Sequence, residues 1–218
     1  MNIPATLRRA AAPIIALCTL LALGACSESS GDTNEFDNWQ SRNEEYFAQV
    51  LANAKSAAGT TSSTWKVITS WAINDDVAQD DDHIVVRVLQ EGSGSGCPLY
   101  TDSVQIHYRG RLIPSNSYPQ GYKFDSSYTG DTLNVKTASP TKFAVSFVVD
   151  GLATALQNMH IGDHWLVYIP HKLGYGATAQ TGIPAYSTLV FEVYLAAYYR
   201  AGTPVTAWSA PRAVMMEE

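Results

Sequence analysis

An ordered series of short motifs between residues 104 and 193 constrains the fold of this 218-residue chain more than any other feature. The motifs supply aromatic rings, aliphatic side chains and few acids, and they include no catalytic nucleophile, metal-ligand cluster or phosphate-binding loop. In chain order they occupy residues 104–110, 124–127, 148–151, 155–162, 169–170, 173–176, 183–184 and 188–193. Side chains of these types predict a small apolar pocket rather than a covalent reaction centre.

Strand-like segments surround this series, and one short helix interrupts them. β-Branched and aromatic residues predict strands at 65–71, 83–90, 103–112, 122–125, 142–147, 163–169 and 188–198. The short helix is predicted at about 150–158. Because strands and helices do not alternate as in βαβ units, we expect an antiparallel α+β domain.

Apolar residues at near-helical spacing precede the strands. Phe36, Trp39, Phe47 and Leu51 belong to this stripe, which predicts one amphipathic helix over about 36–56. The favoured interpretation is that the helix packs on its own domain. The alternative is that it joins two copies of the chain into a homodimer.

The first 25 residues are typical of a secretory signal. Arg8 and Arg9 precede an apolar stretch, 13–23, that is too short for a confident transmembrane span. It ends in Leu-Gly-Ala-Cys, which resembles the lipobox of bacterial lipoproteins. This resemblance implies that Cys26 is diacylated and becomes the new N-terminus, so that lipid anchors the protein to the outer membrane of the cell envelope, facing the periplasm or the cell surface. An ordinary signal peptide with a chance cysteine is the alternative.

Composition limits the partners of the mature chain. Cys18 leaves with the signal and Cys26 carries lipid, so Cys97 is the one remaining thiol and cannot form an internal disulfide. The chain has 14 basic and 20 acidic residues, and removal of Arg8 and Arg9 leaves 12 against 20, a formal charge of −8. This acidity argues against nucleic acid as a partner.

Three local patterns suggest binding sites but lack essential residues. The aspartate-rich run 75–82 lacks the glycine and the terminal glutamate of a calcium-binding EF-hand, so we expect a solvated acidic loop. The glycine-rich run 92–96 is followed by Pro98, where a dinucleotide-binding helix would have to begin. His160 and His164 do not form a zinc-binding helix motif. We therefore expect neither metal nor cofactor.

Eight motifs in one order are far more specific than any of them alone. Over residues 83–198 they resemble the FKBP-type family of peptidyl-prolyl cis–trans isomerases, the macrolide-binding immunophilins. The resemblance implies a curved antiparallel sheet wrapped over one short helix, with the substrate pocket between them. The predicted organisation is a signal peptide at 1–25, a polar tether at 26–33, a helix-and-strand extension at 34–82, the FKBP-like domain at 83–198 and a loose tail at 199–218.

The resemblance also implies roles for individual residues. The expected catalytic set is Tyr108, Asp125, Tyr175 and Phe191. The expected substrate-binding residues are Phe124, Val148, Val149, Leu152 and Ile183, and the backbone N–H of the second valine is expected to contact a ligand carbonyl.

Several positions depart from the family pattern. Leu152 stands where the family usually has the tryptophan of the pocket floor, Thr141 replaces a frequent phenylalanine and Ala185 replaces a proline. The loops 113–123 and 128–139 are longer than is usual in the family and flank Phe124 and Asp125. They could add substrate contacts or cover the pocket.

The implied function is isomerisation of X–Pro bonds in unfolded, exported or outer-membrane proteins, on the periplasmic or the surface face of the envelope. The alternative is a non-catalytic chaperone or peptide-binding module with the same fold.

Overall fold

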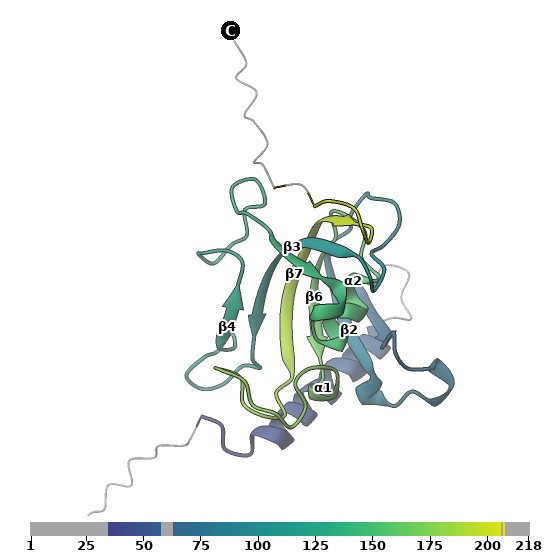
Figure 1. The fold of residues 1–218 in the computed structure, drawn as a ribbon. Coiled ribbons are helices and arrows are strands. Elements are labelled where there is room, and N and C mark those ends of the chain that lie inside the picture. Colours follow the sequence, from purple (N-terminus) through teal and green to yellow (C-terminus); the bar gives the residue numbers. More distant parts are fainter. Residues whose placement is uncertain (1–34, 58–62, 206, 208–218) are drawn as a thin grey trace, which may run out of the picture. The chain divides into compact units, whose positions relative to one another are not determined.

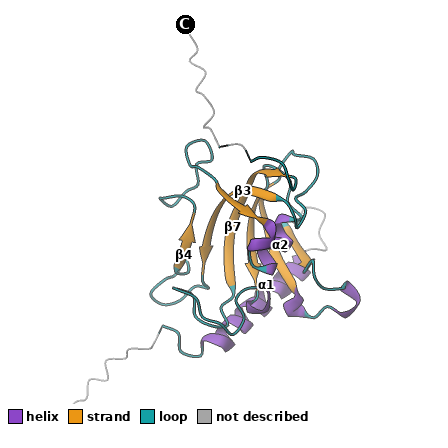
Figure 2. Cartoon of the chain, in the orientation of Figure 1, coloured by secondary structure: helices purple, strands orange, loops and turns teal. Residues whose placement is uncertain are grey.

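The computed structural model describes residues 35–57, 63–205 and 207 of the chain. Within these residues, seven strands form one sheet and two α-helices pack against it (Figures 1 and 2). The helices are α1 (Trp39–Ala57) and α2 (Asp150–Leu156). The strands are β1 (Trp65–Thr69), β2 (His83–Gln90), β3 (Ser103–Arg111), β4 (Lys123–Ser126), β5 (Thr141–Ala144), β6 (His164–Ile169) and β7 (Leu189–Tyr199).

The sheet has the order β1-β2-β6-β7-β3-β4, and β5 pairs with β3. Every pairing in the described part of the chain is antiparallel. One edge of β3 pairs with β7, while its other edge is shared by β5 at the start of the strand and by β4 at the end. The predicted α+β class, a curved antiparallel sheet over one short helix with a helix preceding the domain, is confirmed.

The register of β3 and β7 places two predicted site residues on the same face of the sheet. Tyr108 lies opposite Val193, and Gly110 lies opposite Phe191. Because side chains two residues apart in a strand share a face, Tyr108 and Phe191 are diagonal neighbours. Strand pairing therefore brings together two aromatic rings that lie more than eighty residues apart in the sequence.

Helix α2 lies against the concave face of the sheet (Figure 1). Its residues from Gly151 to Leu156 are all buried, although no side chain caps its N-terminus. A helix this short is not stable alone, so packing must hold it in place. Its close approach to β6 requires a glycine, because a Cβ atom on Gly151 would lie 2.3 Å from Cγ2 of Ile169.

Helix α1 covers the opposite face of the sheet, where it contacts β1, β2 and β6. Phe47, Leu51 and Ala54 pack there with Val85 and Tyr168, whereas the residues on either side of Val85 face α2. The predicted helix and its packing on its own domain are confirmed. A homodimer through α1 would have to use the polar side of this helix, since its apolar side is already covered.

Two strands end at least two residues before their predicted bounds: the strand predicted at 65–71 ends at Thr69, and the larger difference is in the strand predicted at 142–147. The predicted strand 142–147 ends at Ala144, and Val145–Phe147 form a turn of 3₁₀-helix. The N–H of Val145 donates to the carbonyl oxygen of Asp102 at 3.0 Å and so turns the chain toward α2. Local β-propensity could not reveal this tertiary hydrogen bond.

The acidic run is more ordered than a solvated loop. It contains the short 3₁₀-helices Asp75–Val77 and Asp80–Asp82. Asp82 is only 5% exposed, and its carboxylate lies 2.8 Å from Nζ of Lys172. Hydrogen bonds from Lys172 and from the backbone of Gln79 lower the pKa of Asp82. Among the described residues, no cluster of three or more His, Cys, Asp or Glu side chains could hold a metal ion.

No helix within the described ranges combines the length and the apolar character that crossing a membrane requires. The predicted signal peptide, Cys26 and the polar tether lie outside the described residues, as does most of the predicted tail.

Candidate active site

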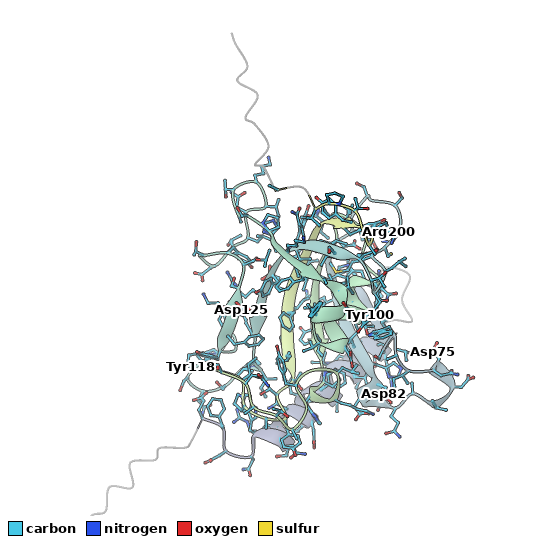
Figure 3. All side chains as sticks on the ribbon, in the orientation of Figure 1. Asp75, Asp82, Tyr100, Tyr118, Asp125 and Arg200 are labelled. Carbon is cyan, nitrogen blue, oxygen red and sulfur yellow. The ribbon has the colours of Figure 1, made fainter. Side chains whose placement is uncertain are left out.

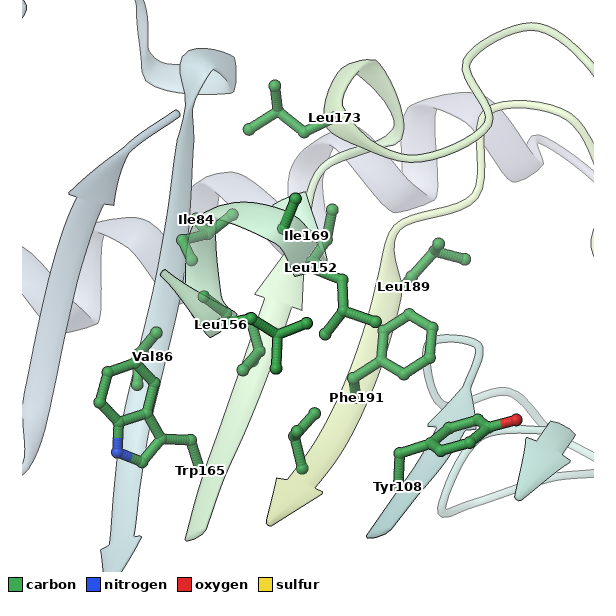
Figure 4. Close-up of a cluster of buried hydrophobic side chains, with 14 of the residues drawn as sticks. Ile84, Val86, Tyr108, Leu152, Leu156, Trp165, Ile169, Leu173, Leu189 and Phe191 are labelled. Carbon is green, nitrogen blue, oxygen red and sulfur yellow. The ribbon is translucent and has the colours of Figure 1, made fainter. Parts of the chain in front are cut away.

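One cavity of about 570 Å³ opens between α2, the strands β3, β4 and β7, and the loop that precedes β7. All nine residues predicted to form the pocket line it. Three of them are labelled in Figure 4, where Phe191 of β7 lies between Leu152 of α2 and Tyr108 of β3. The nine are Tyr108, Phe124, Asp125, Val148, Val149, Leu152, Tyr175, Ile183 and Phe191.

Aromatic rings in edge-on contact form the inner walls of the cavity. The ring of Tyr108 meets that of Phe143 at a centroid distance of 5.5 Å, and Phe124 meets Phe191 at 5.5 Å with an interplanar angle of 82°. These are favourable geometries for aromatic pairs. The rings fit because Gly110 lies beneath them: a Cβ atom there would lie 2.3 Å from the ring of Phe124 and 2.9 Å from that of Phe191.

The polar element of the cavity is a hydrogen bond between Tyr108 and Asp125. The phenol of Tyr108 donates to Oδ2 of Asp125 at 2.6 Å, while Oδ1 of the same carboxylate accepts from the N–H of Ser126 at 2.8 Å. Burial, together with the neighbouring carboxylate, raises the pKa of Tyr108 above its ordinary value. The phenol therefore stays protonated around neutral pH and can keep the carboxylate in one orientation.

Helix α2 supplies the floor and one edge of the cavity. Leu152 is 5% exposed and closes the bottom. Val149 is the residue before the helix, and its carbonyl accepts from the N–H groups of Leu152 and Ala153. Its own N–H has no acceptor among the residues that the structure describes. This donor therefore remains available to a bound carbonyl group.

The loop between β6 and β7 closes the remaining side. Tyr175 is 39% exposed at the mouth of the cavity, whereas Ile183 is 6% exposed. A short turn holds Ile183, because its N–H donates to the carbonyl of Gln180 at 3.0 Å and its carbonyl accepts from the N–H of Gln180 at 2.8 Å.

Five further lining residues were not predicted as site residues: Ile106, Phe143, Phe147, Gln180 and Thr181. Ile106 could have been inferred, since it lies two residues before Tyr108 on the same strand face. Phe147 lies at the rim, is 89% exposed and belongs to the segment wrongly predicted as a strand. Gln180 and Thr181 belong to a turn whose position no sequence pattern indicated.

The fold and the cavity define the class of this part of the molecule: a sheet wrapped over a short buried helix, with an apolar aromatic pocket between them. Residues 97–196 match the family model described as FKBP-type peptidyl-prolyl cis-trans isomerase. In sequence this part of the chain resembles the FKBP-type peptidyl-prolyl cis–trans isomerases, and its fold and its apolar cavity agree with that class.

Individual relatives agree with this class. The chain is 41% identical over 110 residues to the FKBP-type 22 kDa peptidyl-prolyl cis-trans isomerase of Escherichia coli K12, covering 50% of this chain and 47% of that protein. It is 38% identical over 113 residues to the macrophage infectivity potentiator of Trypanosoma cruzi, with 51% of each chain covered. The chain thus spans about half the length of these curated relatives.

Solved structures show the same fold. The crystal structure of FkpA from Escherichia coli superimposes with a TM-score of 0.52 at 27% identity, covering 76% of this chain and 63% of that one.

Proposed function

We propose that the protein is a peptidyl-prolyl cis–trans isomerase that acts on X–Pro bonds of exported or outer-membrane polypeptides. The observation that supports this most strongly is the convergence of all nine predicted residues on one apolar cavity, in which the Tyr108–Asp125 hydrogen bond is the main polar element.

An apolar cavity suits this reaction because of how the peptide bond resists rotation. Amide resonance gives a barrier of about 18–20 kcal/mol, and uncatalysed exchange at proline takes tens to hundreds of seconds. The twisted transition state has lost conjugation, so its carbonyl is less dipolar than that of the planar amide. A site that excludes water binds the twisted form better than the planar one, and this preference accelerates rotation without a nucleophile or a proton transfer.

Each element of the cavity has a role in this proposal. The proline ring lies against Tyr108, Phe191 and Leu152, and the aliphatic side chains before α2 close the edge. The N–H of Val149 donates to a substrate carbonyl. Asp125 holds the Tyr108 ring in place, and the exposed hydroxyl of Tyr175 donates a hydrogen bond to the substrate backbone at the mouth.

The cellular setting is part of the same proposal. The lipobox-like sequence around Cys26 supports a lipid anchor in the cell envelope, with the domain facing the periplasm or the cell surface. Its partners there are proline-containing unfolded or exported polypeptides and the membrane that holds the lipid. The acidity of the chain argues against nucleic acid.

A second candidate is a non-catalytic chaperone or peptide-binding module. Two observations favour it. Leu152 gives the floor of the cavity less apolar area than the usual tryptophan would, and the exposed ring of Phe147 at the rim offers apolar surface for binding a peptide.

A protease-coupled assay with short proline peptides tests the proposal. We expect the chain to accelerate isomerisation above the buffer rate. Asp125→Ala should lower kcat/KM at least about tenfold, since the carboxylate then no longer fixes Tyr108. Asp76→Ala is the control, because it removes an exposed carboxylate that does not line the cavity. A rate equal to that of buffer, with suppressed aggregation of an unfolded client, would favour the module. Leu152→Trp then discriminates further, because it raises the rate only in an otherwise competent pocket.

A further inference from the structure

A second cavity, also of about 570 Å³, adjoins the first. Gln180 and Ile183 line both, so the turn that they form is the wall between the two cavities. The second cavity, which we call the aromatic groove, is otherwise lined chiefly by Phe36, Tyr118, Tyr122 and Pro184. None of these residues is among those predicted for the active site.

The rings of the aromatic groove are exposed to solvent. Phe36 is 42%, Tyr118 43% and Tyr122 36% exposed, and the two tyrosines come from the loop between β3 and β4. Figure 3 labels Tyr118 in this loop and Asp125 in the strand that follows it. Exposed aromatic rings gathered in a hollow are typical of binding surfaces, because each can bury a large area at a low cost in side-chain entropy.

The groove is already formed in the free chain. Tyr118 and Tyr122 contact edge to face at a centroid distance of 5.1 Å, and the N–H of Gly121 donates to the carbonyl of Tyr118 at 2.8 Å. The ring of Tyr122 packs beside Gly182, where a Cβ atom would lie 3.4 Å from it. A preformed site loses little conformational entropy when it binds.

The segment that leads into α1 is fixed to the same loop. The hydroxyl of Ser117 donates to Oε2 of Glu35 at 2.6 Å, and the next residue, Phe36, lines the same groove. Hydrogen bonds from Ser115 and Ser117 lower the pKa of Glu35, so the rim carries a negative charge at neutral pH. The charge disfavours acidic segments next to the aromatic rings.

From this geometry we propose that the aromatic groove is a second substrate subsite, which binds an apolar, preferably aromatic, side chain of the same polypeptide whose proline occupies the first cavity. The inference rests on the proposed isomerase function. The occupant of the groove is the continuing substrate polypeptide because the two cavities share a wall, so a polypeptide that leaves one cavity across Gln180 and Ile183 enters the other. The subsite selects clients with an aromatic residue a few positions from proline and without nearby acids.

Two sets of peptides test the proposal with the full chain. The first is a four-residue peptide with Leu-Pro at its centre, which is too short to fill both cavities. The second is a series of eleven-residue peptides with the same centre, in which one phenylalanine moves through an otherwise alanine background. We expect a gain of about tenfold in kcat/KM at one or two adjacent positions, expressed as a lower KM at constant kcat, because a fully buried phenylalanine contributes binding that is equal in ground and transition states.

The variants locate this gain in the groove. Tyr118→Ala combined with Tyr122→Ala removes the positional gain and leaves the rate on the four-residue peptide within about twofold. Trp71→Ala is the matched control, since Trp71 is also 43% exposed but does not line either cavity. Phe36→Ala removes the third aromatic ring of the groove and keeps the experiment decisive if the double variant does not fold.

A flat profile along the peptide series, or a gain that persists in the Tyr118 and Tyr122 double variant, would overturn the subsite. A gain that appears only after deletion of residues 27–33 would assign the groove to the chain's own N-terminal segment and would also overturn it. If the four-residue peptide isomerises no faster with the wild-type chain than in buffer, that result contradicts the isomerase function instead. Binding of the peptide series, measured by fluorescence anisotropy, then tests the groove independently of turnover.

Discussion

Helix α1 has 19 residues and α2 has seven, and the two cover opposite faces of the same sheet. The longer helix buries one side only, and polar groups help to fix it: Oδ1 of Asn43 accepts from the N–H of Thr188 at 2.7 Å, and the indole N–H of Trp39 donates to the hydroxyl of Ser187 at 2.9 Å. The shorter helix has no side-chain cap at its start and is almost entirely buried.

This contrast separates two tasks. The face under α2 contains the candidate active-site cavity, so the position of that helix fixes the floor of the cavity and the N–H of Val149, which has no acceptor among the described residues. The cluster under α1 contains no residue that lines that cavity. Changes under α2 should therefore alter stability and catalysis together, whereas changes under α1 should alter stability only. Four predictions test this separation.

The largest effect is expected at Gly151. Gly151→Val places branched carbon atoms where even a Cβ atom would lie 2.3 Å from Ile169, so α2 cannot dock. We expect a loss of about 4 kcal/mol or more in the free energy of unfolding, measured by urea denaturation, and no detectable isomerase activity. Ala52→Val on the exposed side of α1 is the control, with a cost of less than about 0.7 kcal/mol. A Gly151→Val variant with the wild-type unfolding midpoint would contradict the assigned packing.

Leu51 on α1 should show the opposite combination. Its side chain is 2% exposed in the cluster beneath that helix, so Leu51→Ala should cost about 2–4 kcal/mol. At a temperature where the variant is fully folded, we expect kcat/KM to equal that of the wild type. Asn53→Ala, at an exposed position of the same helix, should change neither quantity. A lower kcat/KM in folded Leu51→Ala would show that the two faces are coupled.

Tyr108→Phe isolates the polar element of the cavity. The ring stays, but Asp125 loses the phenol that donates to it at 2.6 Å, and we expect kcat/KM to fall about tenfold with about 1 kcal/mol of lost stability. Because the pKa of Tyr108 is raised, the wild-type rate should not fall between about pH 6 and about pH 9 through loss of this proton. A Tyr108→Phe variant as active as the wild type would remove this hydrogen bond from the mechanism.

The smallest effect is expected at Glu192. It follows Phe191 on β7, and because neighbouring side chains in a strand point to opposite faces, it lies on the face away from the cavity. Its carboxylate lies 2.9 Å from Nε2 of His164 and accepts from the hydroxyl of Tyr128 at 3.2 Å, and these contacts lower its pKa. Since the folded pKa is depressed, the stability that it contributes is present above the ordinary value of 4.5 and is lost as the pH falls below it.

Glu192→Gln should therefore cost less than about 1 kcal/mol at neutral pH and flatten the decline of stability in acid, with no change in isomerase activity. Thermal unfolding measured across the acid range checks this. An equally steep acid decline in the variant would place the responsible carboxylate elsewhere.

Much of the fold could be predicted from periodicity. The strands β2, β3, β6 and β7 begin and end within a residue or so of their predicted bounds, because long runs of β-branched and aromatic residues dominate their local preference. The segment after Ala144 could not be predicted, since its turn depends on a hydrogen bond to Asp102, far away in the sequence. The burial of Asp82 likewise depends on Lys172, ninety residues further along the chain.

The candidate site was predictable as a set of residue types in a known order, and the structure brings all nine together. The roles of these residues in catalysis stay predictions. The aromatic groove was not predictable, although the length of the loop 113–123 marked the region. Its rings gather only because Glu35, the turn at Gln180 and the loop itself lie side by side.

The amino-acid sequence by itself determined which segments extend, which one forms the short helix and which side chains are apolar enough to line a pocket, because these properties are local and repeat with the period of each element. The tertiary structure alone decided that α1 covers the far face, that Asp82 is buried and that a second aromatic cavity adjoins the first. Those outcomes depend on contacts between residues far apart in the chain, and no local pattern encodes such distances.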